Sequence, residues 1–63
     1  MRLTDFWDRM EAVFGSAYAH SWASDVVLQS LGVTVNGALA AGVDTKTVWR
    51  AVCEDVEVPS ALV

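Results

Sequence analysis

Apolar side chains recur along residues 3–14 at the spacing of an α-helix. They fall at i, i+3, i+4, i+7, i+10 and i+11, which makes one stripe of Leu3, Phe6, Trp7, Met10, Val13 and Phe14. Thr4 is placed to act as an N-cap, and Gly15 can adopt the left-handed conformation that ends a helix. The pattern therefore predicts a helix at about 5–14 that buries this stripe.

The apolar pattern of residues 17–31 is less regular, because it changes side along the segment. One side carries Tyr18, Trp22 and Val26, and the other carries Val27, Leu28 and Leu31. Such a shift indicates either a central helix that is contacted on several sides, or a helix interrupted near Ser24 and Asp25, which are both good caps. We favour a single central helix over 17–31 that ends at Gly32.

Two short helices with clear capping residues are predicted at 35–41 and 45–56. Thr34 and Asp44 are suitable N-caps, and Gly42 is a suitable left-handed terminator between the two helices. The apolar face of the second of these helices is formed by Val48, Trp49, Val52 and Val56. The pair is helix-turn-helix-like, which is the arrangement of many DNA readers.

These elements predict one all-α domain over residues 1–63, a compact small bundle of about four helices. A chain of this size hides only about 60% of the surface that its unfolded form exposes, so its core and its stability are modest. The apolar fraction of 54% is nevertheless high enough to exclude intrinsic disorder. Little material remains for a deep catalytic cleft.

Net charge indicates which classes of partner the protein is suited to bind, and cysteine content indicates the compartment in which it works. Eight acidic and four basic residues give a net charge of −4, which disfavours nucleic acid and anionic lipid as partners. Cys53 is the only cysteine, and acids interrupt the N-terminal MRLTDFWDRM where a signal peptide is apolar, so we expect a cytoplasmic protein. The uncharged residues 26–43 include glycines and polar side chains, so no membrane helix is expected there.

Four segments, LTDFWDRMEAVFG, YAHSWASD, ALAAGVDTKTVWRAVC and VEVP, carry a resemblance that covers nearly the whole chain. Together they resemble a family of short actinobacterial proteins known as domain of unknown function 3046. The resemblance implies a stand-alone helical protein without an assigned cofactor or catalytic residue. Some genes of that family lie beside the recombinase of homologous repair, which implies a link to DNA-repair housekeeping.

Lys46, Thr47 and Arg50 are the candidate nucleic-acid contacts if 45–56 is a recognition helix. The same polar face also carries Glu54 and Glu57, so it is close to neutral overall. The other two cations are Arg2 and Arg9, and Arg9 has Asp5 one turn before it, so no basic stripe can be assembled. Nucleic acid is therefore the alternative and not the preferred partner.

The three tryptophans, Trp7, Trp22 and Trp49, fall one on each major helix. The simplest interpretation is that their rings converge in the core, since aromatic side chains dominate burial in small domains. The alternative is that one ring is an exposed interface anchor, and Trp49 suits that role because it adjoins Arg50. The candidate interaction surface is accordingly Trp49, Arg50, Glu54 and Glu57.

Catalytic and metal-binding chemistry lack a recognisable motif. A thiolate nucleophile would require Cys53 and His20, the only cysteine and histidine, to meet across two helices. Metal-ligand pairs at i, i+4 or C-x-x-C spacing do not occur, and no cofactor or small-molecule substrate is indicated. We expect a non-enzymatic cytoplasmic module that binds an unidentified protein or itself, with helix-turn-helix nucleic-acid binding as the alternative.

Overall fold

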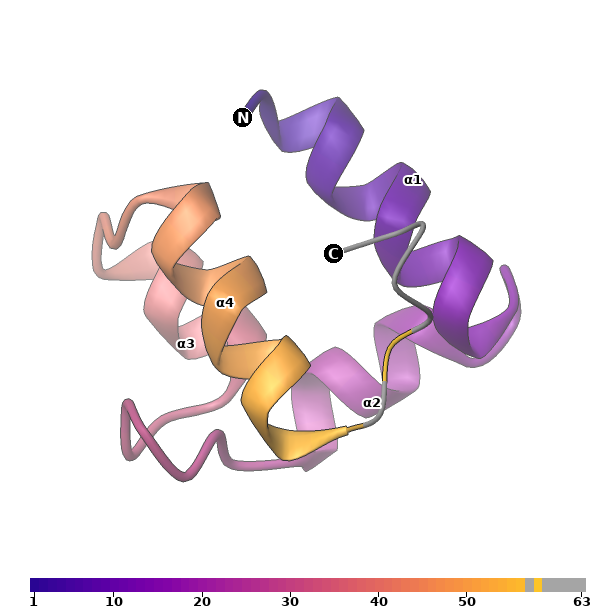
Figure 1. Cartoon of the computed structure of the whole chain (residues 1–63). Coiled ribbons are helices and arrows are strands. Elements are labelled where there is room, and N and C mark those ends of the chain that lie inside the picture. The colour runs from indigo at the N-terminus through magenta and orange to yellow at the C-terminus, as the bar shows by residue number, and fades with distance from the viewer. Residues whose placement is uncertain (57, 59–63) are drawn as a thin grey trace.

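The computed structural model describes residues 1–56 and 58, and it confirms a small all-α fold. Its helices are α1 (Leu3–Phe14), α2 (Ala19–Asp25), α3 (Val35–Ala40) and α4 (Thr45–Asp55). Helix α1 packs against α2 and α4, and α3 packs against the same two helices, so the four elements form a closed ring (Figure 1). Within the described residues, no helix is both long enough and apolar enough to cross a membrane.

Helix α1 begins two residues earlier than predicted, and its N-cap is Arg2, not Thr4. Phe6 and Met10 are fully buried, as the stripe predicts, but Leu3 keeps 52% of its surface exposed. The N-terminal end of α1 reaches past the neighbouring helices (Figure 1), so its first turn has no covering element on that side. At the other end, Gly15 takes a φ of +87°, and its N–H donates to the carbonyl of Glu11.

The single helix predicted over 17–31 is wrong, and the interruption near Ser24 and Asp25 is correct. Helix α2 ends at Asp25, and Val26 is extended with φ −98° and ψ 123°. The chain then turns back on itself: the N–H of Leu28 donates to the carbonyl of Val33 at 2.9 Å, and Val27 pairs with Thr34 in an isolated antiparallel bridge. Consecutive β-branched residues after two capping residues favour this extended path over a helix.

The caps predicted for the last two helices are confirmed. The backbone N–H of Gly37 donates to Thr34 Oγ1 at 3.0 Å, and that of Lys46 donates to Asp44 Oδ2 at 3.2 Å. Gly42 has a φ of +85°, and the turn it makes is a Schellman motif. Both helices end one residue before the predicted limits of 41 and 56.

The core is assembled from all four helices and from the loop between α2 and α3, because Leu28 of that loop is fully buried. The buried residues are Phe6, Met10, Ala19, Trp22, Ala23, Leu28, Val35, Ala38, Val48, Trp49, Ala51 and Val52. Helix α4 contributes more of them than any other element. Its inner face therefore belongs to the core, and Trp49 of this face packs against Phe6 of α1.

Candidate functional site

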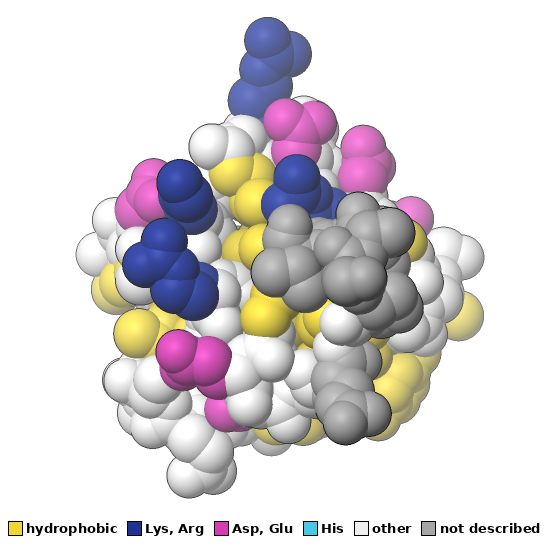
Figure 2. Space-filling view, viewed as in Figure 1, with side chains coloured by type: hydrophobic (Ala, Val, Ile, Leu, Met, Phe, Trp, Pro, Cys, Tyr) yellow, Lys and Arg dark blue, Asp and Glu magenta, His cyan; other side chains and the backbone are white. Residues whose placement is uncertain are grey.

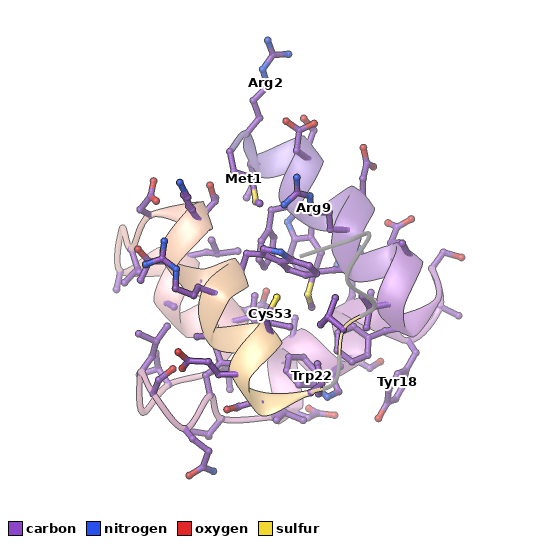
Figure 3. All side chains as sticks on the ribbon, in the orientation of Figure 1. Met1, Arg2, Arg9, Tyr18, Trp22 and Cys53 are labelled. Carbon is purple, nitrogen blue, oxygen red and sulfur yellow. The ribbon has the colours of Figure 1, made fainter. Side chains whose placement is uncertain are left out.

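A groove lies between α4 on one side and, on the other, Met1 and the middle of α1. It has a volume of about 410 Å³ and is lined by Met1, Arg9, Lys46, Trp49, Arg50 and Cys53. This volume falls in the range of about 300–1,000 Å³ that is usual for ligand pockets. Figure 3 shows Met1, Arg9 and Cys53 around the opening between the two helices, with Arg2 pointing away from it.

Local structure explains why these side chains meet. The four lining residues of α4 follow the spacing i, i+3, i+4 and i+7, so they share one face of the helix. Arg9 comes from the facing side of α1. Met1 is held at the upper end because Thr45 Oγ1 donates a hydrogen bond of 2.6 Å to its carbonyl oxygen.

The groove gathers positive charge in a protein whose net charge is −4. Arg9, Lys46 and Arg50 line it, and among the described residues no Asp or Glu does. Figure 2 shows the dark blue Lys and Arg side chains on both sides of a yellow apolar strip. From the sequence, Arg9 is treated as separate from the cations of the last helix, and the fold brings it to the same groove as Lys46 and Arg50.

The ion pairs expected to neutralise these cations do not form in the described residues. Neither Arg9 with Asp5 nor Arg50 with Glu54 makes a salt bridge, although each pair has the i, i+4 spacing. The carboxylate of Glu11 instead lies 3.9 Å from His20 Nε2, on the α1–α2 side of the molecule. Within the described residues, neither arginine is therefore neutralised by an ion pair.

Trp49 forms the floor of the groove and belongs to the core. Only 4% of its surface is exposed, and its ring packs edge-on against Phe6 with centroids 6.1 Å apart. The interpretation of Trp49 as an exposed anchor is therefore wrong, and the interpretation as a core residue is correct. Trp22 is also buried, whereas Trp7 is half-buried and stacks on His20 at 4.3 Å.

The indole nitrogen of Trp49 is an unusual feature of this floor. Nε1 is buried, and among the described residues no acceptor lies within hydrogen-bonding distance of it. Buried tryptophans usually find a partner for this N–H. A buried donor left unpaired costs about 1–3 kcal/mol.

Cys53 is a half-buried thiol on the groove wall. Burial raises the pKa of this thiol, and the positive charge of Arg9 opposes that rise. The thiol is consequently protonated at neutral pH, which makes it a poor nucleophile. His20 stacks on Trp7 and approaches Glu11, so the structure gives Cys53 and His20 different neighbours.

The acidic part of the predicted interaction surface lies at a second hollow and not in the groove. It measures about 480 Å³ and is lined by Trp22, Val26, Val27, Gln29, Glu54, Asp55 and Val56. Asp55 Oδ2 accepts a hydrogen bond of 3.0 Å from the backbone N–H of Gln29. Within residues 1–56 and 58, no three His, Cys, Asp or Glu side chains gather closely enough to hold a metal ion.

The residues predicted from sequence are thus divided between two sites. Arg50 and Trp49 line the groove with Lys46 from the alternative set, and Glu54 lines the second hollow. Thr47 is exposed and lines neither, while Glu57 lies outside the described residues. Arg9, Met1 and Cys53 are not among the binding residues predicted from sequence. The helical spacing of 46, 49, 50 and 53 could have identified Cys53, but no local signal pairs α4 with Arg9.

Comparison with known proteins gives one match. A family model described as a protein of unknown function (DUF3046) matches residues 1–61. No curated protein and no solved structure matches the chain significantly. The match spans nearly the whole chain, so the matched region includes both the residues of the groove and those of the core.

Proposed function

Because the chain belongs to the DUF3046 family, whose description assigns no activity, we propose a function from the groove itself: a non-enzymatic module that binds another protein. The observation that carries this proposal is the convergence of three cations on an apolar floor between α1 and α4. An apolar patch within a polar rim is the usual composition of a protein-binding surface.

The partner that fits this groove is a protein segment with acidic and apolar side chains. Lys46 and Arg50 stand on one side and Arg9 on the other, so an acidic segment would meet opposite charge on both sides. Complementary charge steers encounter and fixes the register of a complex. A second copy of this chain is less suited as the partner, because its Asp55 already accepts a hydrogen bond from the backbone N–H of Gln29.

Nucleic-acid binding through Lys46, Thr47 and Arg50 is the second candidate, since two of these residues line the cationic groove. Phosphate contacts dominate such binding, and each one needs a cation. Three cations around an apolar floor, in a chain of net charge −4, provide a small electrostatic footprint for a duplex. We therefore rank it below protein binding.

The compartment and process proposed are the cytoplasm and DNA-repair housekeeping. A single half-buried cysteine with a raised pKa suits a reducing compartment, where disulfides are rare. The link to repair is supported by the family resemblance alone.

Affinity capture from native cytoplasm tests the proposal if it compares two charge reversals. Arg50→Glu places an acid in the groove, and Arg2→Glu makes the same change in net charge outside it. We expect the first variant to lose the partner and the second to retain it. Trp49→Ala is unsuitable as the main variant because removing a buried Trp costs about 3–5 kcal/mol and threatens the fold.

Equal capture by both variants, with native helicity in each, would remove the groove from the function. Two further measurements, one with added duplex DNA and one on the protein alone, test nucleic-acid binding and self-association. Amide shifts at residues 44–51 that appear with duplex DNA at low salt and vanish with added salt would favour the second candidate. A concentration-dependent rise in mass that Arg50→Glu abolishes would make the partner a second copy of this chain.

A further inference from the structure

We propose that the protein segment seated in the groove is an amphipathic α-helix with acidic residues on both sides of its apolar stripe. The inference rests on the proposed function and adds the conformation and the charge pattern of the partner. Arg9 on one side of the groove, and Lys46 and Arg50 on the other, are the residues that would recognise this helix.

The arrangement of charge across the groove is the first observation behind this proposal. Lys46 and Arg50 line the groove from α4, and Arg9 lines it from α1. Figure 2 shows the Lys and Arg side chains on both sides of an apolar strip. A segment that matches the groove must therefore present three parallel rows of side chains: an acidic row, an apolar row and a second acidic row.

This requirement selects a helix over an extended segment. Successive side chains of a strand point to opposite faces, so a strand presents only one row to a groove. A helix presents its apolar stripe together with the residues that flank the stripe on each side, as in a coiled coil. Recognition of an amphipathic helix by a groove is one of the common modes of peptide binding. The occupant would complete a three-helix arrangement with α1 and α4.

The spacing of the lining residues along α4 is the second observation. Lys46 and Arg50 are separated by about one turn, or about 6 Å along the helix axis. Acidic residues at i and i+4 of a partner helix have the same separation, so both can face these cations when the two helices lie side by side. The lining of α4 extends from Lys46 to Cys53, about 10 Å, so the contact needs a partner helix of at least two turns.

The apolar lining exposes little surface, so the charges decide which partner fits. Met1 is 40% exposed, whereas Trp49 is only 4% exposed. Methionine is unbranched and flexible, and it adapts to neighbouring side chains of different shape. The apolar contact therefore accepts several side chains, and the charge pattern fixes the register and the specificity. We expect the binding to weaken with added salt.

Helix α1 of a second copy is the competing occupant, because it is amphipathic and carries Asp5, Asp8 and Glu11 on its polar side. Its apolar stripe is already used, since Phe6 and Met10 are fully buried in the core. Seating this stripe in a neighbouring molecule would expose that core to water. The occupant is therefore a helix of another protein.

Three capped peptides of about 15 residues, which is long enough to form a helix, test the proposal. The first has leucines at i, i+3, i+4 and i+7 with glutamates on both sides of them. The second has the same composition, but its glutamates lie opposite the leucines. The third is the first with a proline in its middle, which breaks the helix.

Binding is followed through the backbone amide signals of the ¹⁵N-labelled protein. We expect the first peptide to shift signals of residues 44–53 in a saturable way and to gain helicity on binding. It should bind about tenfold more tightly than the second peptide, because the second places its carboxylates away from the three cations. The third peptide should also bind at least about tenfold more weakly than the first.

Charge exchange tests the two sides of the groove separately. Arg9→Glu and Arg50→Glu should each weaken binding of the first peptide, whereas Arg2→Glu, outside the groove, should bind as the parent does. One lysine in place of a glutamate on one side of the peptide should restore binding to Arg50→Glu only. One lysine on the other side should restore binding to Arg9→Glu only. Circular dichroism checks that each variant keeps native helicity.

Three results would overturn the inference: equal binding of the first and second peptides, equal binding of the first and third, and rescue of both variants by a lysine on the same side. The comparison of the three peptides uses the unaltered protein, so it remains decisive if a variant does not fold. If Arg50→Glu abolishes capture of the native partner in any of these cases, the proposed interaction function stands and only the helix assignment fails. If capture is insensitive to Arg50→Glu, the function fails whatever the peptides do.

Discussion

At the scale of single residues, Trp49 links the core to the groove. Its ring packs against the buried Phe6 in a T-shaped arrangement, and the side chain also lines the groove beside Arg50 and Cys53. A side chain in this position can transmit binding to the core, since any movement of the ring must displace close-packed neighbours. Trp49 is therefore both a core residue and a lining residue of the groove.

Cys53 provides a residue-scale prediction about pH. Its pKa is raised by burial, so the folded protein favours the neutral thiol over the thiolate. Alkylation of the native protein by iodoacetamide should be slow at pH 7 and should accelerate at a higher pH than for a free thiol of pKa about 8.5. The stabilisation from this thiol is present below the unfolded pKa and is lost as pH rises through the folded pKa.

Arg9→Gln checks the cause of that behaviour. The positive charge of Arg9 lowers the pKa of Cys53, so its removal should move the midpoint of the alkylation profile to still higher pH. Arg2→Gln is the matched control and should leave the profile unchanged. A profile that moves to lower pH in Arg9→Gln would contradict the assigned electrostatics.

At the scale of elements, side-chain caps determine where α3 and α4 begin, and α1 begins without one. Thr34 and Asp44 each accept a hydrogen bond from a backbone N–H of the first turn. Thr4 is the same type of residue as Thr34 but lies inside α1, and the N-cap residue Arg2 makes no capping bond through its side chain. A suitable residue type therefore permits a cap, but the position of the helix start decides whether it forms.

Three alanine substitutions test this distinction. Thr34→Ala and Asp44→Ala should each reduce the free energy of unfolding by about 1 kcal/mol, because each leaves a first-turn N–H without its side-chain acceptor. Thr4→Ala should change it by less than about 0.5 kcal/mol. Urea unfolding followed by circular dichroism measures all three, and a loss in Thr4→Ala equal to that in Thr34→Ala would contradict the observed start of α1.

At the scale of the whole molecule, the four helices form a ring that is completed by the segment between α2 and α3. That segment holds Leu28 in the core and donates the N–H of Gln29 to Asp55 at the end of α4. The loop is thus packed against elements on both sides of it. Closure of the ring holds α4 against α1, and the groove forms between these two helices.

Leu28 and Val27 are neighbours that test the role of this segment. Leu28→Ala should cost about 2–5 kcal/mol because it leaves a cavity in the core. Val27→Ala should cost less than about 1 kcal/mol, since Val27 is 50% exposed. Thermal unfolding compares the two, and similar losses would mean that the segment contributes no specific packing.

Sequence patterns predicted most of the elements for identifiable reasons. The stripe of α1 and the caps of α3 and α4 depend on residues within one or two turns of each other, and local geometry decides them. The pattern predicts a helix over segment 26–31 because apolar residues continue there without a strong breaker. Its extended path depends on a bridge to Thr34 and on burial of Leu28, and neither is visible in a helical period.

The sequence by itself determined an acidic, apolar-rich chain with four helical segments and the turn at Gly42, because composition, periodicity and capping act over short distances. Only the tertiary structure decided that Trp49 is buried, that Arg9 joins Lys46 and Arg50, and that Glu54 lies at another hollow. The physical reason is that burial and charge clustering depend on which helix faces which. That arrangement follows from the closure of the whole ring and not from any one segment.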